Sequence, residues 1–303
     1  MLKFPHLFEQ IFQKLDNKSL FKSKEVARSW KYFMNETNYS WLLVVNIPMV
    51  LKNSNTYLHL AVEARQYNAF KTAHSEEEDK NIKNDYGETP FHLACKKGCF
   101  KIVELLLEST NLNINAKDNH GYTGFIRACM KGHSKVVKLF MEYAPSVNLN
   151  QKENKGRTGF HMSCGLGHTN LVKIFMESSA TLSIDLNTKD NVGHTAFHFA
   201  CGFGCINVVK MIMENSANFS IDLNAKDNLG QTAFHLACKF DRFSVAKMII
   251  ENSAIFSIDL NGKDNDDLTA FNRVCNHGMM KLIKNNADTF KIDLSWPQGH
   301  KIP

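Results

Sequence analysis

Histidine and cysteine residues lie close together in two segments of this chain, at spacings that a metal site could use. The two groups are His92, Cys95 and Cys99, then His198, Cys201 and Cys205. A structural zinc site takes four such ligands in a tetrahedral arrangement. Each group supplies three at most, and Gly98 or Gly204 would interrupt the helix that brings them to one face. We therefore expect the cysteines to pack as small apolar residues, with no metal and no cofactor.

Six of the eight cysteines instead follow a regular interval along the sequence. They are Cys95, Cys129, Cys164, Cys201, Cys238 and Cys275, separated by 34, 35, 37, 37 and 37 residues. Seven threonines keep a similar period: Thr56, Thr89, Thr123, Thr158, Thr195, Thr232 and Thr269. An interval of roughly 20 to 50 residues indicates stacked supersecondary units. The regularity therefore predicts an internal repeat, which neither a disulfide framework nor a zinc site would require.

One unit is clearest in residues 188–224. Thr195 predicts the N-cap of a first short helix, and Gly204 predicts its end. Apolar residues return at helical spacing from Ile206 to Met213, which predicts a second helix. Residues 190–193 contain Asn and Gly, which tolerate positive φ, and therefore predict a tight turn before the first helix. Each unit is thus expected to be a pair of short helices with an extended turn.

This unit resembles the ankyrin repeat, whose pattern D-x-x-G-x-T-P-L-H-x-A it matches almost position by position. The resemblance implies an all-α solenoid of stacked helix-turn-helix units, about six full and one degenerate. Full units begin near Ile82, Ala116, Gln151, Thr188, Ala225 and Gly262. Phenylalanine replaces the family leucine at Phe91, Phe125, Phe160, Phe197, Phe234 and Phe271. We predict a joint and the degenerate unit over residues 46–81, six repeats over 82–295 and a C-terminal tail over 296–303.

The resemblance also implies roles for two recurring polar positions. In ankyrin repeats the recurring histidine bonds to the turn and to the next unit, which here concerns His59, His92, His161, His198 and His235. Asparagines in the turn before the next unit are hydroxylation targets in some members of the family. The matching residues are Asn115, Asn150, Asn187, Asn224 and Asn261. The alternative is that these asparagines only form hydrogen bonds within the turn.

Residues 1–45 lack the repeat and predict a small helical module. Phe4, Phe8, Ile11 and Leu15 would share one face of a helix. The segment resembles an F-box, whose pattern runs L-P-x-E-I/L-x-x-x-I-F-x-x-L-D, then L, then V-C-R-x-W. The matching residues are Phe4, Pro5, Phe8, Ile11, Phe12, Leu15, Asp16, Leu20, Val26, Arg28 and Trp30, with Phe4 in place of the family leucine and Ala27 in place of the cysteine.

An F-box docks on the Skp-type adaptor of an SCF ubiquitin ligase, and the domain behind it holds the substrate. The resemblance therefore implies an adaptor-binding set: Phe4, Pro5, Phe8, Ile11, Leu15, Leu20, Val26 and Trp30. It implies a protein-interaction adaptor that serves as the substrate-recognition subunit of such a ligase. The alternative is an ankyrin-repeat scaffold or inhibitor whose N-terminal helices only cap the first unit.

Composition and motifs disfavour other function classes. Hydrophobic residues make up 44% and charged residues 22% of the 303, as in ordinary globular proteins. The sequence has no phosphate loop, G-x-S-x-G elbow or H-E-x-x-H pair, so we expect no catalytic residues. An enzyme or a metal-dependent regulator is kept only as a minor alternative.

Charge and hydropathy disfavour nucleic-acid and membrane partners. The net charge is +6, and residues 1–52 carry eight basic and four acidic side chains, or +4, which leaves +2 for the repeats. That balance does not make the basic stripe that phosphate binding needs. The longest apolar run, Trp41 to Leu51, falls short of the ~20 residues of a membrane span, and the first residues do not form a signal peptide. We expect a cytoplasmic or nuclear protein that is not secreted.

Positions that vary between units predict the surface for a protein target. In ankyrin proteins the turn tips and the end of the first helix face the concave groove. Here these positions hold Tyr86, Lys97, Tyr122, Lys131, Leu166, Val192, Phe203, Leu229 and Phe240. Early units offer lysine and tyrosine and later units offer apolar side chains, so we expect a partner with an apolar anchor and an acidic flank toward the early units. The alternative is that the apolar side chains pack against neighbouring helices.

Overall fold

The computed structural model describes residues 54–296, apart from 69, 72–78, 144–145 and 275. The predicted F-box-like residues, from Phe4 to Trp30, lie outside the described residues. The chain divides into unit 1, which ends at Lys131, and unit 2, which begins at Gly132. Within the described ranges the regular structure is entirely helical. This confirms the all-α prediction for the repeats.

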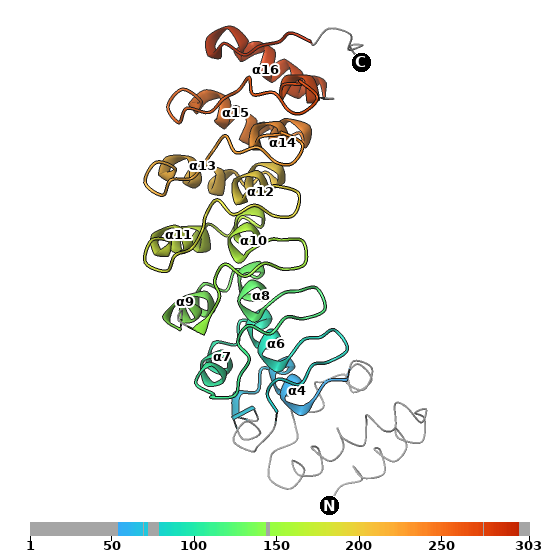
Figure 1. The fold of residues 1–303 in the computed structure, drawn as a ribbon, viewed down its shortest axis with the longest axis vertical. Helices are drawn as coiled ribbons and strands as arrows, with labels where there is room; N and C mark the ends of the chain where they lie inside the picture. Colours follow the sequence, from blue (N-terminus) through green and yellow to red (C-terminus); the bar gives the residue numbers. More distant parts are fainter. Residues whose placement is uncertain (1–53, 69, 72–78, 144–145, 275, 297–303) are drawn as a thin grey trace, which may run out of the picture. The chain divides into compact units, whose positions relative to one another are not determined.

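Unit 1 contains the first helices of the described chain. They are α4 (Tyr57–Glu63), α6 (Pro90–Lys97), α7 (Phe100–Leu107) and α8 (Gly124–Met130). Helix α6 packs against α4 on one side and α8 on the other, and α7 packs against α6 (Figure 1). The degenerate unit predicted around Thr56 therefore forms a helix, with Thr56 as its N-cap.

Unit 2 has two rows of helices. They are α9 (Ser134–Glu142), α10 (Gly159–Gly165), α11 (Thr169–Ser178), α12 (Ala196–Phe203), α13 (Ile206–Asn215), α14 (Ala233–Lys239), α15 (Phe243–Asn252), the 3-10 helix η3 (Phe271–Arg273) and α16 (His277–Phe290). Helices α10, α12 and α14 form the inner row, and α9, α11, α13 and α15 form the outer row (Figure 1). Extended turns lie on the side of the inner row away from the outer row (Figure 1).

Local sequence signals fix the ends of the inner helices. Thr195 is the N-cap of α12 in an extended conformation, and Gly204 is its C-cap with φ of 77°. Both predictions are confirmed. The same threonine position caps α6, α8, α10 and α14. These caps satisfy amide groups that have no partner within the helix.

Neighbouring turns in unit 2 are bonded to one another. Asn228 donates its backbone N–H to the carbonyl of Val192 at 3.1 Å. Gly193, with φ of 86°, lies so close that a Cβ there would stand 2.5 Å from Oδ1 of Asn228. Glycine is therefore required by both the backbone conformation and the approach of the next turn.

The core consists of repeated apolar positions. The phenylalanines that replace the family leucine are all buried: Phe91, Phe125, Phe160, Phe197, Phe234 and Phe271. Outer helix α13 buries Val208, Val209, Ile212 and Met213 on the face toward the inner row. Burying each such side chain contributes roughly 1.5–3 kcal/mol. No helix in the described ranges has both the length and the apolar character to cross a membrane.

Candidate protein-interaction surface

The recurring histidines are part of the backbone framework. Nδ1 of His198 accepts the backbone N–H of Thr195 at 3.2 Å, and Nε2 donates to the carbonyl of Gln231 in the next repeat at 3.1 Å. His59, His92, His161 and His235 make the equivalent pairs of bonds. Both ring nitrogens are therefore engaged, as the resemblance implied, and neither is available to a ligand.

Burial keeps these histidines neutral. It lowers the pKa of His59 and His198 to about 4, and it also lowers the pKa of His92, His161 and His235. A proton on Nδ1 would point at the N–H of the capping threonine, so protonation would break the cap. The neutral form with its hydrogen on Nε2 fits both partners.

The recurring cysteines lie in the core of the described repeats. Cys95, Cys129, Cys164, Cys201 and Cys238 are buried. Burial raises the pKa of the Cys95, Cys164, Cys201 and Cys238 thiols. The more exposed Cys205 donates its S–H to the carbonyl of Gly165 at 3.3 Å. Buried thiols with raised pKa values suit packing and are poorly suited to nucleophilic chemistry.

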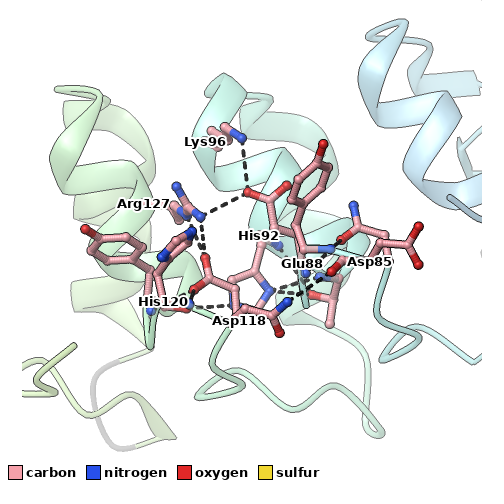
Figure 2. A network of polar contacts seen from close by, with 12 residues as sticks. Asp85, Glu88, His92, Lys96, Asp118, His120 and Arg127 are labelled. Carbon is pink, nitrogen blue, oxygen red and sulfur yellow. Dashed lines mark hydrogen bonds and ion pairs between the residues drawn. The ribbon is translucent and has the colours of Figure 1, made fainter. Parts of the chain in front are cut away.

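A network of charged side chains joins two repeats of unit 1. Glu88 accepts from Lys96 at 3.0 Å and from Arg127 at 3.2 Å, and Arg127 also pairs with Asp118 (Figure 2). Asp118 accepts the backbone N–H of His120 at 2.9 Å, so the network also fixes the turn. Since these cations already face carboxylates, the network is built to hold the repeats together.

The predicted surface residues of unit 1 differ in their exposure. Tyr86 and Lys131 are exposed. Lys97 is half-buried and pairs with Glu63 at 2.6 Å. Tyr122 is also half-buried, and Cζ of Arg127 lies over its ring, 4.6 Å from the ring centroid. The basic character that the sequence suggested here is therefore reduced at Lys97 by Glu63 of helix α4.

The predicted surface residues of unit 2 are apolar and exposed. Leu166, Phe203 and Phe240 stand at corresponding positions at the ends of α10, α12 and α14, and their side chains are 53%, 62% and 49% exposed. Val192 and Leu229, at the turn tips, are exposed as well. Phe203 and Phe240 also lie against the preceding inner helix, because a Cβ at Gly165 or Gly202 would stand 3.4 Å or 3.6 Å from their rings. The side chains are thus partly exposed and partly packed against a neighbouring helix.

A hollow of about 300 Å³ lies between α12 and α14. It is lined by His194, His198, Phe199, Gly202, Phe203, Leu236, Phe240 and Arg242. Gly202 lines the hollow without a side chain, and a Cβ there would meet the Phe240 ring at 3.6 Å. The Phe199 and Phe203 rings stack with centroids 6.0 Å apart and make one wall aromatic.

Three ionisable side chains line this hollow, and His198 among them is bonded through both ring nitrogens. His194 directs Nε2 to Asp227 at 3.2 Å and lies 4.0 Å from Asp190, so it is already engaged with acidic groups. Arg242 donates Nε to the carbonyl of Gly202 at 2.8 Å, and no ion pair between described residues includes it. The rim of the hollow thus offers one anchored guanidinium that faces no carboxylate.

Family comparisons agree with this geometry. The family model for ankyrin repeats in three copies matches residues 58–152 and 125–227, and the model for a single ankyrin repeat matches residues 229–261. The chain belongs to the ankyrin-repeat family. Ankyrin repeats are typical protein–protein interaction modules. No curated protein matches this sequence significantly.

Solved ankyrin-repeat structures share the fold. The human ASB11 ankyrin repeat domain is 17% identical with a TM-score of 0.64, and covers 77% of this chain and 98% of its own. The ankyrin repeat domain of Bcl-3, described as a unique member of the IkappaB protein family, is 18% identical with a TM-score of 0.62, and covers 76% and 98%. At these identities the likeness concerns the ankyrin fold alone.

The ankyrin asparagines singled out for hydroxylation bond between repeats. Asn187 donates Nδ2 to the carbonyl of Ser220 at 2.8 Å and accepts the backbone N–H of Asp222 at 3.0 Å. Asn150, Asn224 and Asn261 make the same pair of bonds to the following segment. Their side chains therefore bridge to the next segment, whereas the sequence suggested bonds within one turn. Hydroxylation stays a prediction, and intact-mass spectrometry of native protein without a +16 Da species would contradict it.

Sequence reasoning missed most of the hollow. Phe199, Gly202, Leu236, His194 and Arg242 were not among the predicted surface residues. One signal was available, because Gly165 and Gly202 stand where other repeats carry Lys96, Met130 and Lys239. A small residue directly before an exposed apolar one indicates a gap in the ankyrin surface.

Proposed function

We propose that this ankyrin-repeat protein is a non-catalytic adaptor that binds a protein target through the inner helices of unit 2. The observation that carries the proposal is the exposure of Leu166, Phe203 and Phe240 at corresponding positions of three consecutive repeats. Exposed apolar groups that recur in this way mark partner sites, and aromatic side chains dominate the energetics of interfaces.

The double variant Phe203→Ala with Phe240→Ala tests this surface. We expect it to lose the target that co-purifies with the full chain from its native host, measured by quantitative mass spectrometry. Ile255→Ala is the matched control, because Ile255 is 73% exposed but lies in the loop after α15. Unchanged target recovery in the double variant would contradict the proposal.

We further propose that residues 1–45 recruit a Skp-type adaptor, which would make the protein the substrate receptor of an SCF-type ubiquitin ligase. The support is the F-box-like pattern of Pro5, Ile11, Leu15, Leu20 and Trp30. Short helices with exposed apolar residues are stabilised by such a partner. The repeats would then hold the target for modification.

Co-expression of the full chain with a Skp-type adaptor tests this second step. We expect a complex on size exclusion that is lost in Pro5→Ala with Leu15→Ala. Absence of any complex, with the repeats folded by circular dichroism, would make residues 1–45 a cap. The protein would then be a scaffold or inhibitor that acts by occupying its target.

A further inference from the structure

The hollow between α12 and α14 has the size and walls to receive part of a protein chain. Its volume of about 300 Å³ lies at the low end of the range of roughly 300–1,000 Å³ for small-molecule sites. Its walls, Phe203 and Phe240, are themselves about half exposed. A small ligand would fill the hollow and leave the outer faces of these rings in water. A protein segment that inserts one side chain also covers the rings around it.

Charge beside the hollow selects the kind of segment. The Nε bond to the carbonyl of Gly202 holds Arg242 at the rim and leaves its terminal N–H groups for an acceptor. Lys239 adds a second cation, with Nζ 5.9 Å from the centroid of the Phe240 ring. Asp241 is exposed next to them in the chain but is not among the lining residues, and the carboxylate of Asp227 is taken by His194. A carboxylate is the group that a planar guanidinium binds best.

Resting on the proposed protein-binding function, we propose that the hollow receives one large apolar side chain of the target and that Arg242 pairs with an Asp or Glu next to it in the same segment. The acidic contact therefore lies beside the apolar anchor. The sequence alone placed it toward the early repeats, where Lys97 pairs with Glu63 and Lys96 with Glu88.

Random peptides displayed on phage supply the probe, selected against the full-length protein. We expect the enriched peptides to carry Phe, Trp, Leu or Met beside Asp or Glu. Binding of each peptide is then measured by fluorescence anisotropy to the wild type and to Gly202→Leu, which fills the hollow from its floor. The first carbon of the new side chain fits, since the Gly202 Cβ site has ordinary contact distances, and the melting temperature shows whether the variant folds. Phe240→Ala removes a wall and serves if Gly202→Leu does not fold.

A double-mutant cycle isolates the ion pair. Replacing the peptide's Asp with Asn, or its Glu with Gln, should weaken binding to the wild type roughly tenfold. The same replacement should have no effect on binding to Arg242→Gln, which lacks the charge. Lys173→Gln, an exposed charge change on α11, is the control and should leave the tenfold effect intact.

Three results would overturn the inference. In the first, the peptides bind Gly202→Leu and Phe240→Ala as tightly as the wild type. In the second, the carboxylate of the enriched peptides can be replaced without loss of affinity. In the third, the selections yield no peptide that prefers the wild type to Gly202→Leu. Binding of the native target by the variants distinguishes a failure of this inference from a failure of the proposed function. Target binding lost in Phe203→Ala with Phe240→Ala but kept in Gly202→Leu and Arg242→Gln overturns the inference alone. Target binding kept in all of them overturns both.

Discussion

Asp241 has a left-handed backbone conformation, with φ of 55°, directly after α14. Four other repeats hold glycine at this position, namely Gly98, Gly132, Gly167 and Gly204, all with positive φ, and the degenerate unit holds Arg65 with φ of 56°. A residue with a Cβ is strained in this region, although Asp tolerates it better than most. The repeat that carries Arg242 thus contains a local strain that its neighbours avoid.

Replacing Asp241 with glycine should therefore stabilise the protein. We expect Asp241→Gly to raise the free energy of unfolding by about 0.5–1 kcal/mol in urea titrations. The same substitution at Asp288, which is exposed within α16, should lower it by about 1 kcal/mol because glycine weakens a helix. A loss of stability in Asp241→Gly would contradict the account of the strain.

At the scale of elements, turn and helix use glycine for different reasons. Gly193 is required by positive φ and by the close approach of Asn228 from the next turn. Gly202 lies within α12, where a Cβ would meet its neighbours only at ordinary contact distances of 3.6 Å or more. The turn glycine supports stacking, whereas the helix glycine leaves room for the hollow.

Replacement of each of these two glycines by alanine should change the free energy of unfolding in opposite directions. Gly193→Ala should lower the free energy of unfolding by about 1–3 kcal/mol, since both strain and the clash with Asn228 oppose it. Gly202→Ala should raise it by up to about 1 kcal/mol through better helix propensity. Thermal unfolding followed by circular dichroism measures both, and melting temperatures that shift in the same direction would speak against this distinction.

The helix pairs were predictable because their signals are local. Thr195 and Gly204 mark the two ends of α12, and the recurring Cys201 position marks its buried face. The hollow was not predictable in the same way, since Arg242 meets the carbonyl of Gly202 across 40 positions of sequence. Likewise, Lys97 appeared to be a free cation because its partner Glu63 belongs to another repeat. Interactions between repeats decide which surface groups remain available.

At the scale of the whole molecule, the buried histidines link stability to pH. In the unfolded chain a histidine takes up a proton near pH 6.5, whereas His59 and His198 do so at about 4 in the folded chain. Between these values the unfolded state binds more protons, so stability is complete above pH 6.5 and falls as the pH drops toward 4. At pH 5 the shifted pKa of His198 alone lowers the free energy of unfolding by about 2 kcal/mol relative to neutral pH.

We expect the urea concentration at the unfolding midpoint to decrease when the pH is lowered from 7.5 to 5.5. Carboxylates are not yet protonated in this range. His198→Asn should make this fall shallower while keeping the fold. The last repeat supplies the precedent, because Asn272 accepts the N–H of Thr269 at 3.0 Å and donates to the carbonyl of Ser295 at 3.0 Å. An equal midpoint at the two pH values would show that the histidines do not carry this linkage.

The central claim is that the inner helices of unit 2 bind a protein target. Photocrosslinking from these helices tests it most directly. The photoreactive amino acid p-benzoylphenylalanine is placed in the full chain at position 203, at position 240 or at the control position 255, all three of which hold exposed apolar residues. We predict that irradiation in the native host joins one protein target to positions 203 and 240 and not to position 255. A target joined equally at position 255, or bound to the chain without any adduct at 203 and 240, would contradict the claim.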